Sequence, residues 1–395
     1  MRIVVFCHSL LSDWNHGNAH FLRGVVSELV FRGHEVRVFE PRDAWSIQNL
    51  LAERGGAAAL EEVLQTYPAV RPVRYELARF DLDEALDGAD VVIVHEWNEH
   101  ALVKGIGERR ARGGSFKLLF HDTHHRSVTD ESSMGAYDLR HYDGVLAFGR
   151  EIRDLYLKRG WTQRAWTWHE AADTRVFRPL RAQGTASASP ERASGLERAQ
   201  GAVREEGDAD LVWVGNWGDE ERTAELHEFL LQPVKTLGLR ATVHGVRYPE
   251  PGLQALAESG CRFGGWLPNH RVPVAFARAR VTVHIPRRPY VRALPGIPTI
   301  RPFEALACGI PLISAPWDDT EQLFTPGRDF LVAPTGAEMT RLLRDVLNDD
   351  ALRSALITHG LRTVQRRHTC AHRVDELLAI VGGLGIPSST ERSIA

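Results

Sequence analysis

Short runs of apolar residues recur along the chain, separated by polar, glycine-containing loops and by amphipathic segments. The apolar runs are continuous rather than alternating, which is typical of strands in a parallel sheet that helices cover on both faces. At the start of the chain this pattern predicts a strand over residues 3–7, a helix over 20–32 and a second strand over 35–39. Gly33 stands just after that helix, where glycine commonly ends one.

Further apolar runs extend the pattern through both halves of the chain. In the first half they predict strands over 91–94, 117–120, 144–147 and 165–168. In the second half they predict strands over 211–214, 241–244, 281–285 and 311–314, helices near 220–231 and 302–308, and a helical segment over 338–381. Strands that alternate with helices in this way predict an α/β protein.

The pattern stops between the two halves. Residues 181–208 are rich in Ala, Ser, Gly, Glu and Arg, so we predict a linker or variable segment there, with a charged helix over 191–206. A chain of 395 residues is long enough for two or three domains. We predict a first domain over 1–180, a second over 209–366, and over 367–395 a C-terminal helix that packs back on the first domain, with a frayed tail from 388.

Composition and charge exclude several classes of protein. The 48 basic and 51 acidic residues give a net charge of -3, which lacks the strongly basic character of a dedicated nucleic-acid-binding protein. The four cysteines are far apart and form no Cys-x-x-Cys pair, which argues against a zinc ribbon or a disulfide framework. The first apolar run is too short for a signal peptide, and no run approaches the roughly 20 residues of a membrane span. We therefore expect a cytoplasmic protein without a transmembrane segment.

Histidine stands at the end of six predicted strands, at His8, His95, His121, His169, His244 and His284. Ligands of open parallel sheets bind outside the carboxyl ends of the strands, so two such domains facing each other would line one cleft with imidazoles. Each histidine taken alone is better explained as a hydrogen-bonded structural residue. As a set, they predict where the cleft lies.

The densest polar cluster is the run His121, Asp122, Thr123, His124 and His125. One interpretation is a loop that contacts a hydroxylated substrate, with His121 or Asp122 as proton acceptor or charge stabiliser and Glu96 and His95 in reserve. A zinc site is a second interpretation, although the spacing fits no common closed site. A turn capped by Asp122 is the structural alternative.

The first loop contains Gly17 and Asn18 just before a predicted helix. A glycine at this place lets backbone N–H groups approach an anion at the helix N-terminus, as in dinucleotide sites. The loop has neither a Gly-x-Gly-x-x-Gly motif nor a Walker lysine. Both an NAD-dependent dehydrogenase and a P-loop NTPase are therefore disfavoured.

The segment over 296–313 carries a second candidate anion site. Pro302 suits the first turn of a helix, and Gly309 ends that helix. Thr299 and Arg301 beside the helix N-terminus predict an anion site by dipole and by charge. Glu304 is able to accept two hydrogen bonds from a vicinal diol such as ribose. The plain alternative is an amphipathic helix whose N-terminal glutamate is favoured by the dipole.

The run from Phe303 to Pro311 resembles the donor-site motif of GT-B glycosyltransferases, in which a Glu is followed by Ala-x-Ala-x-Gly-x-Pro. Three other landmarks of that fold agree in order. They are the Gly loop at 16–18 with the Arg-Gly-His-Glu-Val turn at 32–36, the interdomain crossover at 172–179, and the strand and loop at 214–217. The resemblance spans nearly the whole chain. The spacing of Thr299, Arg301 and Glu304 is most similar to the spore-maturation CgeB-like branch.

The resemblance implies a GT-B fold, with two Rossmann-like domains whose parallel sheets face each other across a cleft. The first domain would bind the acceptor, and the second a nucleotide-diphosphate sugar, with a UDP-sugar slightly favoured and no metal or other cofactor required. Glu304 would hold the donor ribose, and Arg222 and Arg301 would neutralise the diphosphate. The expected donor-binding residues are Gly17, Asn18, Asn216, Arg222, His244, Trp266, Thr299, Arg301 and Glu304, and the expected catalytic residues are His121, Asp122 and Glu96.

One position departs from the family pattern. Many retaining relatives have a second Glu eight positions before the ribose Glu, and here that position is Gly296. The carboxylate would have to come from elsewhere, such as Asp318 or Asp319, so retention of stereochemistry is only a mild preference. The departure also keeps two rival functions in view: a nonhydrolysing sugar-nucleotide epimerase of the same fold, and a non-catalytic coat or assembly protein with a degenerate donor site.

The sequence does not identify the acceptor: it is compatible with a small molecule, a glycan or a lipid-linked compound. The basic residues Lys104, Arg109, Arg110 and Arg112 are compatible with peripheral membrane contact. A solvated helix face is the plainer explanation of these charges. We expect a monomer or a homodimer.

Overall fold

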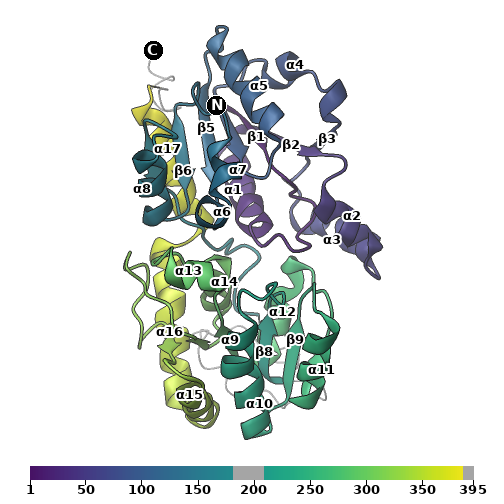
Figure 1. Ribbon diagram of the computed structural model, residues 1–395, viewed down its shortest axis with the longest axis vertical. Coiled ribbons are helices and arrows are strands. Elements are labelled where there is room, and N and C mark those ends of the chain that lie inside the picture. Colours follow the sequence, from purple (N-terminus) through teal and green to yellow (C-terminus); the bar gives the residue numbers. More distant parts are fainter. Residues whose placement is uncertain (181–208, 386–395) are drawn as a thin grey trace, which may run out of the picture.

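Two sheets of parallel strands, one in each half of the chain, form the framework of the computed structural model (Figure 1). The structure describes residues 1–180 and 209–385. The predicted linker at 181–208, its predicted helix and the predicted tail from 388 lie outside these residues. Helices follow most of the strands, so the predicted α/β class is confirmed.

The first sheet has the strand order β3-β2-β1-β4-β5-β6-β7 and the second has the order β10-β9-β8-β11-β12-β13. The strands of the first sheet are β1 (Arg2–Phe6), β2 (Glu35–Pro41), β3 (Val73–Tyr75), β4 (Val91–His95), β5 (Lys117–Asp122), β6 (Gly144–Ala147) and β7 (Ala165–Thr167). Those of the second sheet are β8 (Ala209–Val214), β9 (Ala241–His244), β10 (Cys261–Phe263), β11 (Ala279–His284), β12 (Leu312–Ser314) and β13 (Leu331–Val332).

Helices cover both sheets. In the first half they are α1 (Ala19–Phe31), α2 (Trp45–Ala52), α3 (Gly56–Thr66), η1 (Leu77–Arg79), α4 (Leu82–Leu86), α5 (His100–Ala111), α6 (Arg126–Thr129), α7 (Glu131–Gly135) and α8 (Arg150–Lys158). In the second half they are α9 (Thr223–Leu226), η2 (His227–Leu231), α10 (Gln232–Leu237), α11 (Glu250–Glu258), η3 (Asn269–Arg271), α12 (Val272–Ala277), α13 (Arg288–Arg292), α14 (Ile300–Cys308), α15 (Gly336–Asn348), α16 (Asp350–Arg367) and α17 (Cys370–Gly383).

In both sheets the strand order reverses beside the first strand, between β1 and β4 and between β8 and β11. Phe6 pairs there with Val94, and Val212 pairs with Thr282. Open parallel sheets bind ligands beyond the carboxyl ends of the strands at such a reversal. The loops that follow these four strands are therefore the ones that the fold offers to a ligand.

The chain crosses between the two sheets twice, and the crossings lie side by side. Ala172 and Thr369 form a parallel bridge, and Cys370 N donates a 3.0 Å hydrogen bond to Ala172 O. After the second crossing, α17 packs on α1, and its Val374 and Leu377 share a core with Phe21. Figure 1 shows α17, in yellow, lying with the first half while α15 and α16 lie with the second.

The structure differs from the predicted pattern in two places. Strands β3, β10 and β13 were not predicted, because they are two or three residues long and lie at the outer edges of the sheets. The segment predicted as helical over 338–381 is three helices. Both breaks between them are fixed by side chains that accept backbone N–H groups, Asp349 before α16 and Thr369 before α17.

The basic residues of α5 are paired within the first half. Lys104 lies 3.7 Å from Glu108, Arg109 pairs with Asp83, and Arg110 donates a 2.7 Å hydrogen bond to Gly114 O. This pairing agrees with a solvated helix face. Within 1–180 and 209–385, no helix has the length and apolar character needed to cross a membrane.

Candidate active site between the two sheets

A cavity of about 740 Å³ lies between the two halves of the chain. Its walls come from the loops after β1, β4, β5, β6 and β7 on one side and after β8, β9 and β11 on the other, together with α2 and the start of α14. These are carboxyl-end loops in both sheets. The cavity therefore lies at the ends of the strands that the histidines marked, but of the six strand-ending histidines only His284 lines it.

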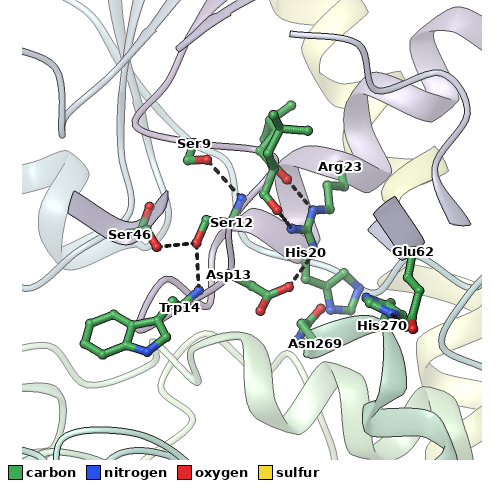
Figure 2. A network of polar contacts seen from close by, with 12 residues as sticks. Ser9, Ser12, Asp13, Trp14, His20, Arg23, Ser46, Glu62, Asn269 and His270 are labelled. Atoms are coloured by element: carbon green, nitrogen blue, oxygen red, sulfur yellow. Dashed lines mark hydrogen bonds and ion pairs between the residues drawn. The ribbon is translucent and has the colours of Figure 1, made fainter. Parts of the chain in front are cut away.

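The loop after β1 is fixed before any ligand arrives. Glu40 Oε2 accepts a 2.8 Å hydrogen bond from Leu10 N, and burial is the main reason why the pKa of Glu40 is raised. The fully buried Arg23 donates a 2.6 Å hydrogen bond to Leu10 O. It also donates a 2.9 Å hydrogen bond to Asp13 Oδ2 (Figure 2). A buried ion pair with further hydrogen bonds holds its geometry firmly. The loop therefore presents Gly17 and Asn18 to the cavity in one conformation.

Arg222 lies at the opposite wall and is held by three groups. Its Nη1 donates to Ile285 O at 2.9 Å, its Nη2 donates to Asn216 Oδ1 at 2.8 Å, and its guanidinium lies 5.1 Å from the ring centre of Trp213. Burial, with the charge of Arg287 next, lowers the pKa of Arg222 to about 9, so the side chain stays cationic at neutral pH. Arg222 Nε makes no hydrogen bond with a described residue.

The N-terminus of α14 opens into the same wall. Thr299, Ile300 and Arg301 line the cavity, and the helix begins two residues before the predicted Pro302. Thr299 has φ 58°, and its side chain does not cap the helix. The first backbone N–H groups of a helix lack partners within the helix and attract anions. Together with Arg222 and Arg301, this end makes one wall of the cavity strongly cationic.

Glu304 lies one turn into α14 but is fully buried and does not line the cavity. Its Oε1 accepts 2.7 Å hydrogen bonds from His20 Nδ1 and Asn269 Nδ2, and its Oε2 pairs with Arg301. Burial raises the pKa of Glu304, but the charge of Arg301 and the hydrogen bonds outweigh it, so the net pKa lies below its usual value. The carboxylate is therefore ionised and has its oxygens engaged.

The three expected catalytic residues come together behind the wall of the cavity rather than on it. Glu96 Oε1 accepts a 3.0 Å hydrogen bond from Thr123 N, and Asp122 Oδ1 accepts a 3.1 Å hydrogen bond from His124 N. Burial raises the pKa of Asp122 to about 6, and burial and Asp122 raise the pKa of Glu96. Both carboxyl groups thus hold the segment of Thr123 and His124, which does line the cavity.

His121 is fully buried beside Trp168 and His95, with ring centres 4.8 and 5.2 Å away. Neither of its ring nitrogens hydrogen-bonds to a described residue, and burial lowers its pKa to about 3. A neutral imidazole enclosed by rings is suited to packing. Across residues 1–180 and 209–385, no three His, Cys, Asp or Glu side chains are grouped as metal ligands, so the zinc interpretation of the 121–125 run gains no support.

The remaining expected donor residues divide into two groups. Asn216 and Trp266 line the cavity, as do Gly17, Asn18 and Thr299. His244 does not, because it packs against the Gly264 loop next to Trp266, where a Cβ on Gly264 would lie 2.4 Å from the ring. Sequence reasoning missed Arg287, which lines the cavity and donates to Asn216 Oδ1 at 3.0 Å.

Sequence reasoning also missed Glu170, a buried carboxyl group on the cavity wall. Its Oε1 accepts a 2.8 Å hydrogen bond from Asn18 Nδ2. Burial raises its pKa to about 8, and the charge of Glu304 adds to the rise. Its place directly after a predicted strand and His169 was the signal that would have found it.

Gly296 leaves no room for the glutamate that many retaining relatives have. It has φ 86°, and a Cβ would lie 2.6 Å from Thr320 Oγ1 and 2.8 Å from Glu321 Cγ. Asp319 does not replace that carboxylate, because its oxygens accept hydrogen bonds from the backbone of its own loop at Leu323 and Phe324. Neither Asp318 nor Asp319 lines the cavity.

Two further features mark the cavity as functional. Backbone strain gathers there: four of its lining residues that are not glycine have positive φ, namely Asn15, Asp219, Arg247 and Thr299. Several lining residues also carry buried polar atoms without a hydrogen bond to a described residue, namely His16 Nε2, His124 Nδ1, Arg222 Nε, Trp266 Nε1 and His284 Nε2. Unpartnered polar atoms are rare in protein interiors and call for an explanation.

Comparison with known proteins points to one fold. Residues 222–379 match the family described as glycosyl transferase-like. Among curated protein sequences, none matches the chain. Sucrose-phosphate synthase from Thermosynechococcus elongatus is similar in structure, with a TM-score of 0.63 at 15% identity over 97% of this chain and 99% of that one.

Two other solved structures are similar over nearly their whole length. An α-glucosyltransferase in complex with UDP and a 13-mer DNA has a TM-score of 0.64 at 11% identity, covering 97% of this chain and 99% of that one. The Anabaena protein Alr3699/HepE, in complex with UDP and glucose, has a TM-score of 0.61 at 12% identity, covering 97% and 100%. With two parallel α/β sheets facing each other across a cleft, the chain has the GT-B fold of glycosyltransferases.

Proposed function

We propose that the protein is a glycosyltransferase of the CgeB-like branch that moves a sugar from a nucleotide-diphosphate sugar to a hydroxyl-bearing acceptor without a metal ion. The observation that carries the proposal is the cationic wall, where Arg222, Arg301 and the N-terminus of α14 meet in a cavity between two GT-B sheets. The neighbours solved with UDP support a uridine nucleotide as the donor.

The cationic wall receives the diphosphate. In the reaction the bond between the anomeric carbon and the diphosphate oxygen breaks, and the electron pair leaves with the diphosphate. The acceptor oxygen bonds to the anomeric carbon, and the hydroxyl proton passes to the leaving diphosphate. Arginine and helix N–H groups already aimed at the diphosphate oxygen stabilise its charge without reorganising. These groups take the part that a metal ion has in other transferases, so activity should persist in EDTA.

Glu304 is the expected ribose ligand, but it is engaged from both sides. A ribose diol reaches its Oε1 only if Asn269 or His20 gives up a 2.7 Å hydrogen bond. Donor binding by Glu304 is therefore coupled to a local rearrangement where α1 meets α14. Trp266 lies on the same wall and is suited to the face of the base.

The acceptor hydroxyl lies on the side of the first sheet in this proposal. His124 lines the cavity, and burial together with His125 lowers its pKa, so its ring is neutral. Its Nδ1 makes no hydrogen bond to a described residue but is buried, so it accepts the hydrogen bond of the acceptor hydroxyl only after a local rearrangement. Asp122 and Glu96 act as positioning residues behind it, and His121 packs below them. Glu170, a buried carboxyl group on the cavity wall, is our candidate to take the place of the glutamate that is absent at Gly296.

A thermal-shift panel of UDP-, GDP-, ADP- and dTDP-sugars tests the proposal, because a ligand that binds the folded state raises the melting temperature. We expect one nucleotide series to raise it clearly. If none does, the non-catalytic interpretation is favoured. Incubating the binding donor without an acceptor separates the epimerase, which would release an isomerised nucleotide sugar.

A further inference from the structure

Three indole rings line the part of the cavity that belongs to the first sheet. Trp14 lies in the loop after β1, Trp45 begins α2, and Trp97 follows β4. The ring centre of Trp45 is 6.2 Å from that of Trp14 and 6.5 Å from that of Trp97, with interplanar angles of 75° and 72°. Residues far apart in sequence thus form one aromatic wall, which we call the indole wall.

Hydrogen bonds fix the orientation of Trp14. Its Nε1 donates to Glu53 Oε1 at 2.9 Å, and its backbone N donates to Ser12 Oγ at 3.2 Å. Ser12 Oγ in turn donates to Ser46 O at 2.7 Å, which ties Trp14 to the start of α2, as Figure 2 shows. The ring is therefore set in place by the protein alone.

The other two indoles are held through one face each. His8 stacks on Trp45 with ring centres 4.6 Å apart and an interplanar angle of 30°. The Arg126 guanidinium lies 4.6 Å from the ring centre of Trp97. One face of each of these two rings is therefore covered by the protein, and both residues line the cavity.

The charged groups that touch the indole wall do not line the cavity: Glu53 accepts the hydrogen bond of Trp14 Nε1, and Arg126 lies 3.9 Å from Glu96 and 3.7 Å from Asp130. Burial lowers the pKa of His8 to about 4 and keeps the pKa of His16 and His124 below its usual value, so these imidazoles are neutral. Asp13 forms an ion pair with Arg23. The arginines that line the cavity, namely Arg222, Arg247, Arg287 and Arg301, all come from the second half of the chain.

We propose that the indole wall is the acceptor subsite and that it takes an uncharged sugar ring, an inference that rests on the proposed glycosyltransferase function. The C–H face of a pyranose packs on an indole face, and aromatic walls with a few placed polar groups are typical of such pockets.

The charge distribution argues against two other acceptors. A lipid diphosphate or a sugar phosphate would need a second cationic site, and among the described residues of the first half no Lys or Arg lines the cavity. A nucleobase also stacks on aromatic rings, but DNA brings phosphates that proteins meet with Lys or Arg. A neutral saccharide is the occupant that matches both the rings and the charge.

The test measures transfer with the whole protein and the donor identified by the thermal shift. The acceptor panel contains methyl glycosides and disaccharides of glucose, galactose, mannose and N-acetylglucosamine, with glucose 6-phosphate, a polyprenyl phosphate and a DNA duplex beside them. We expect transfer to a neutral saccharide. In Trp45→Ala and Trp97→Ala its KM should rise by about 10-fold while the donor KM stays within about twofold.

Two controls separate stacking from folding. Trp45→Phe keeps an aromatic face and should restore most of the acceptor affinity. Trp161→Phe alters a tryptophan that packs on Tyr156 outside the cavity and should change neither KM. The inference is overturned if only a phosphorylated compound or DNA accepts the sugar, if no saccharide does, or if the two alanine variants leave the acceptor KM unchanged. Failure of every nucleotide sugar to bind would instead overturn the proposed function.

Discussion

His20 Nδ1 and Glu304 Oε1 lie 2.7 Å apart, both fully buried, and join α1 of the first half to α14 of the second. The other ring nitrogen of His20 accepts a 2.9 Å hydrogen bond from Asp173 N. That bond requires Nε2 to be unprotonated, so the proton of a neutral ring is on Nδ1 and is donated to Glu304. Through these two hydrogen bonds, the His20 side chain joins α1 to α14 and to the first crossing between the sheets.

Glu304→Ala should lower the free energy of unfolding by about 3 kcal/mol, because it leaves Arg301 without its buried partner and leaves His20 and Asn269 without an acceptor. Urea unfolding checks the loss of stability. The matched control is Glu338→Ala, which removes the exposed partner of Arg341. Equal stability of the two variants would contradict the linking role of Glu304.

Arg222→Gln should weaken UDP binding by about 10- to 100-fold, because a hydrogen bond to a charged group contributes roughly 1.5 to 3 kcal/mol. Isothermal titration calorimetry with UDP measures the change. Arg240→Gln serves as the control, since Arg240 is exposed and lies outside the cavity. If UDP binds equally well to both variants, the cationic wall is not the diphosphate site.

The sequence predicts an element well where a local run of residues determines that element. Central strands such as β1, β4 and β8 are buried on both faces and carry continuous apolar runs, so their positions were predictable to within a residue or two. Edge strands such as β10, whose Arg262 and Phe263 are exposed, carry no such run. Local motifs likewise located Gly17, Thr299 and Arg301 on the cavity wall.

What the sequence could not supply depends on how the two sheets meet. The burial of Glu304 is due to His20, which is 284 residues away, and no local pattern encodes that contact. The three tryptophans of the indole wall lie far apart in the sequence, and only the sheet topology brings them together. Asp122 and Glu96 were expected to be catalytic residues in contact with a substrate, whereas both are fully buried behind the loop that they hold.

Gly296→Glu should destabilise the protein rather than restore the carboxylate of retaining relatives. The positive φ of 86° and the 2.6 Å approach of Thr320 Oγ1 to a Cβ leave no unstrained conformation for a side chain. Gly296→Ala alone should cost about 1 to 3 kcal/mol. Gly383→Ala is the matched control, because a Cβ there meets nothing within 4 Å and the residue ends a helix. A Gly296→Ala variant as stable as Gly383→Ala would contradict the steric argument.

Buried neutral histidines should make the fold sensitive to acid. Burial lowers the pKa of His121 and His284 to about 3, whereas the unfolded chain binds a proton near 6.5. The unfolded state therefore binds more protons below pH 6.5, and each group costs up to about 1.4 kcal/mol per pH unit as the pH falls. Replacing His121 by Leu should make unfolding less dependent on pH between 6.5 and 5. Identical slopes for the variant and the parent would show that His121 is already charged in the folded protein.

Glu170 should affect the pH dependence of stability in the opposite direction from the buried histidines, by lowering stability as the pH rises. Its pKa is raised to about 8 in the folded protein, chiefly by burial, against the usual 4.5. Between these values the folded state holds a proton that the unfolded chain has lost, so this contribution to stability is complete at low pH and disappears as the pH rises toward 8. Glu170→Gln keeps an uncharged side chain of the same shape at every pH. Urea unfolding from pH 5 to 8.5 should therefore show a stability that falls less steeply for Glu170→Gln than for the parent, while the exposed Glu338→Gln follows the parent. A parallel fall in all three proteins would mean that Glu170 is ionised in the folded state and faces the cavity as a carboxylate.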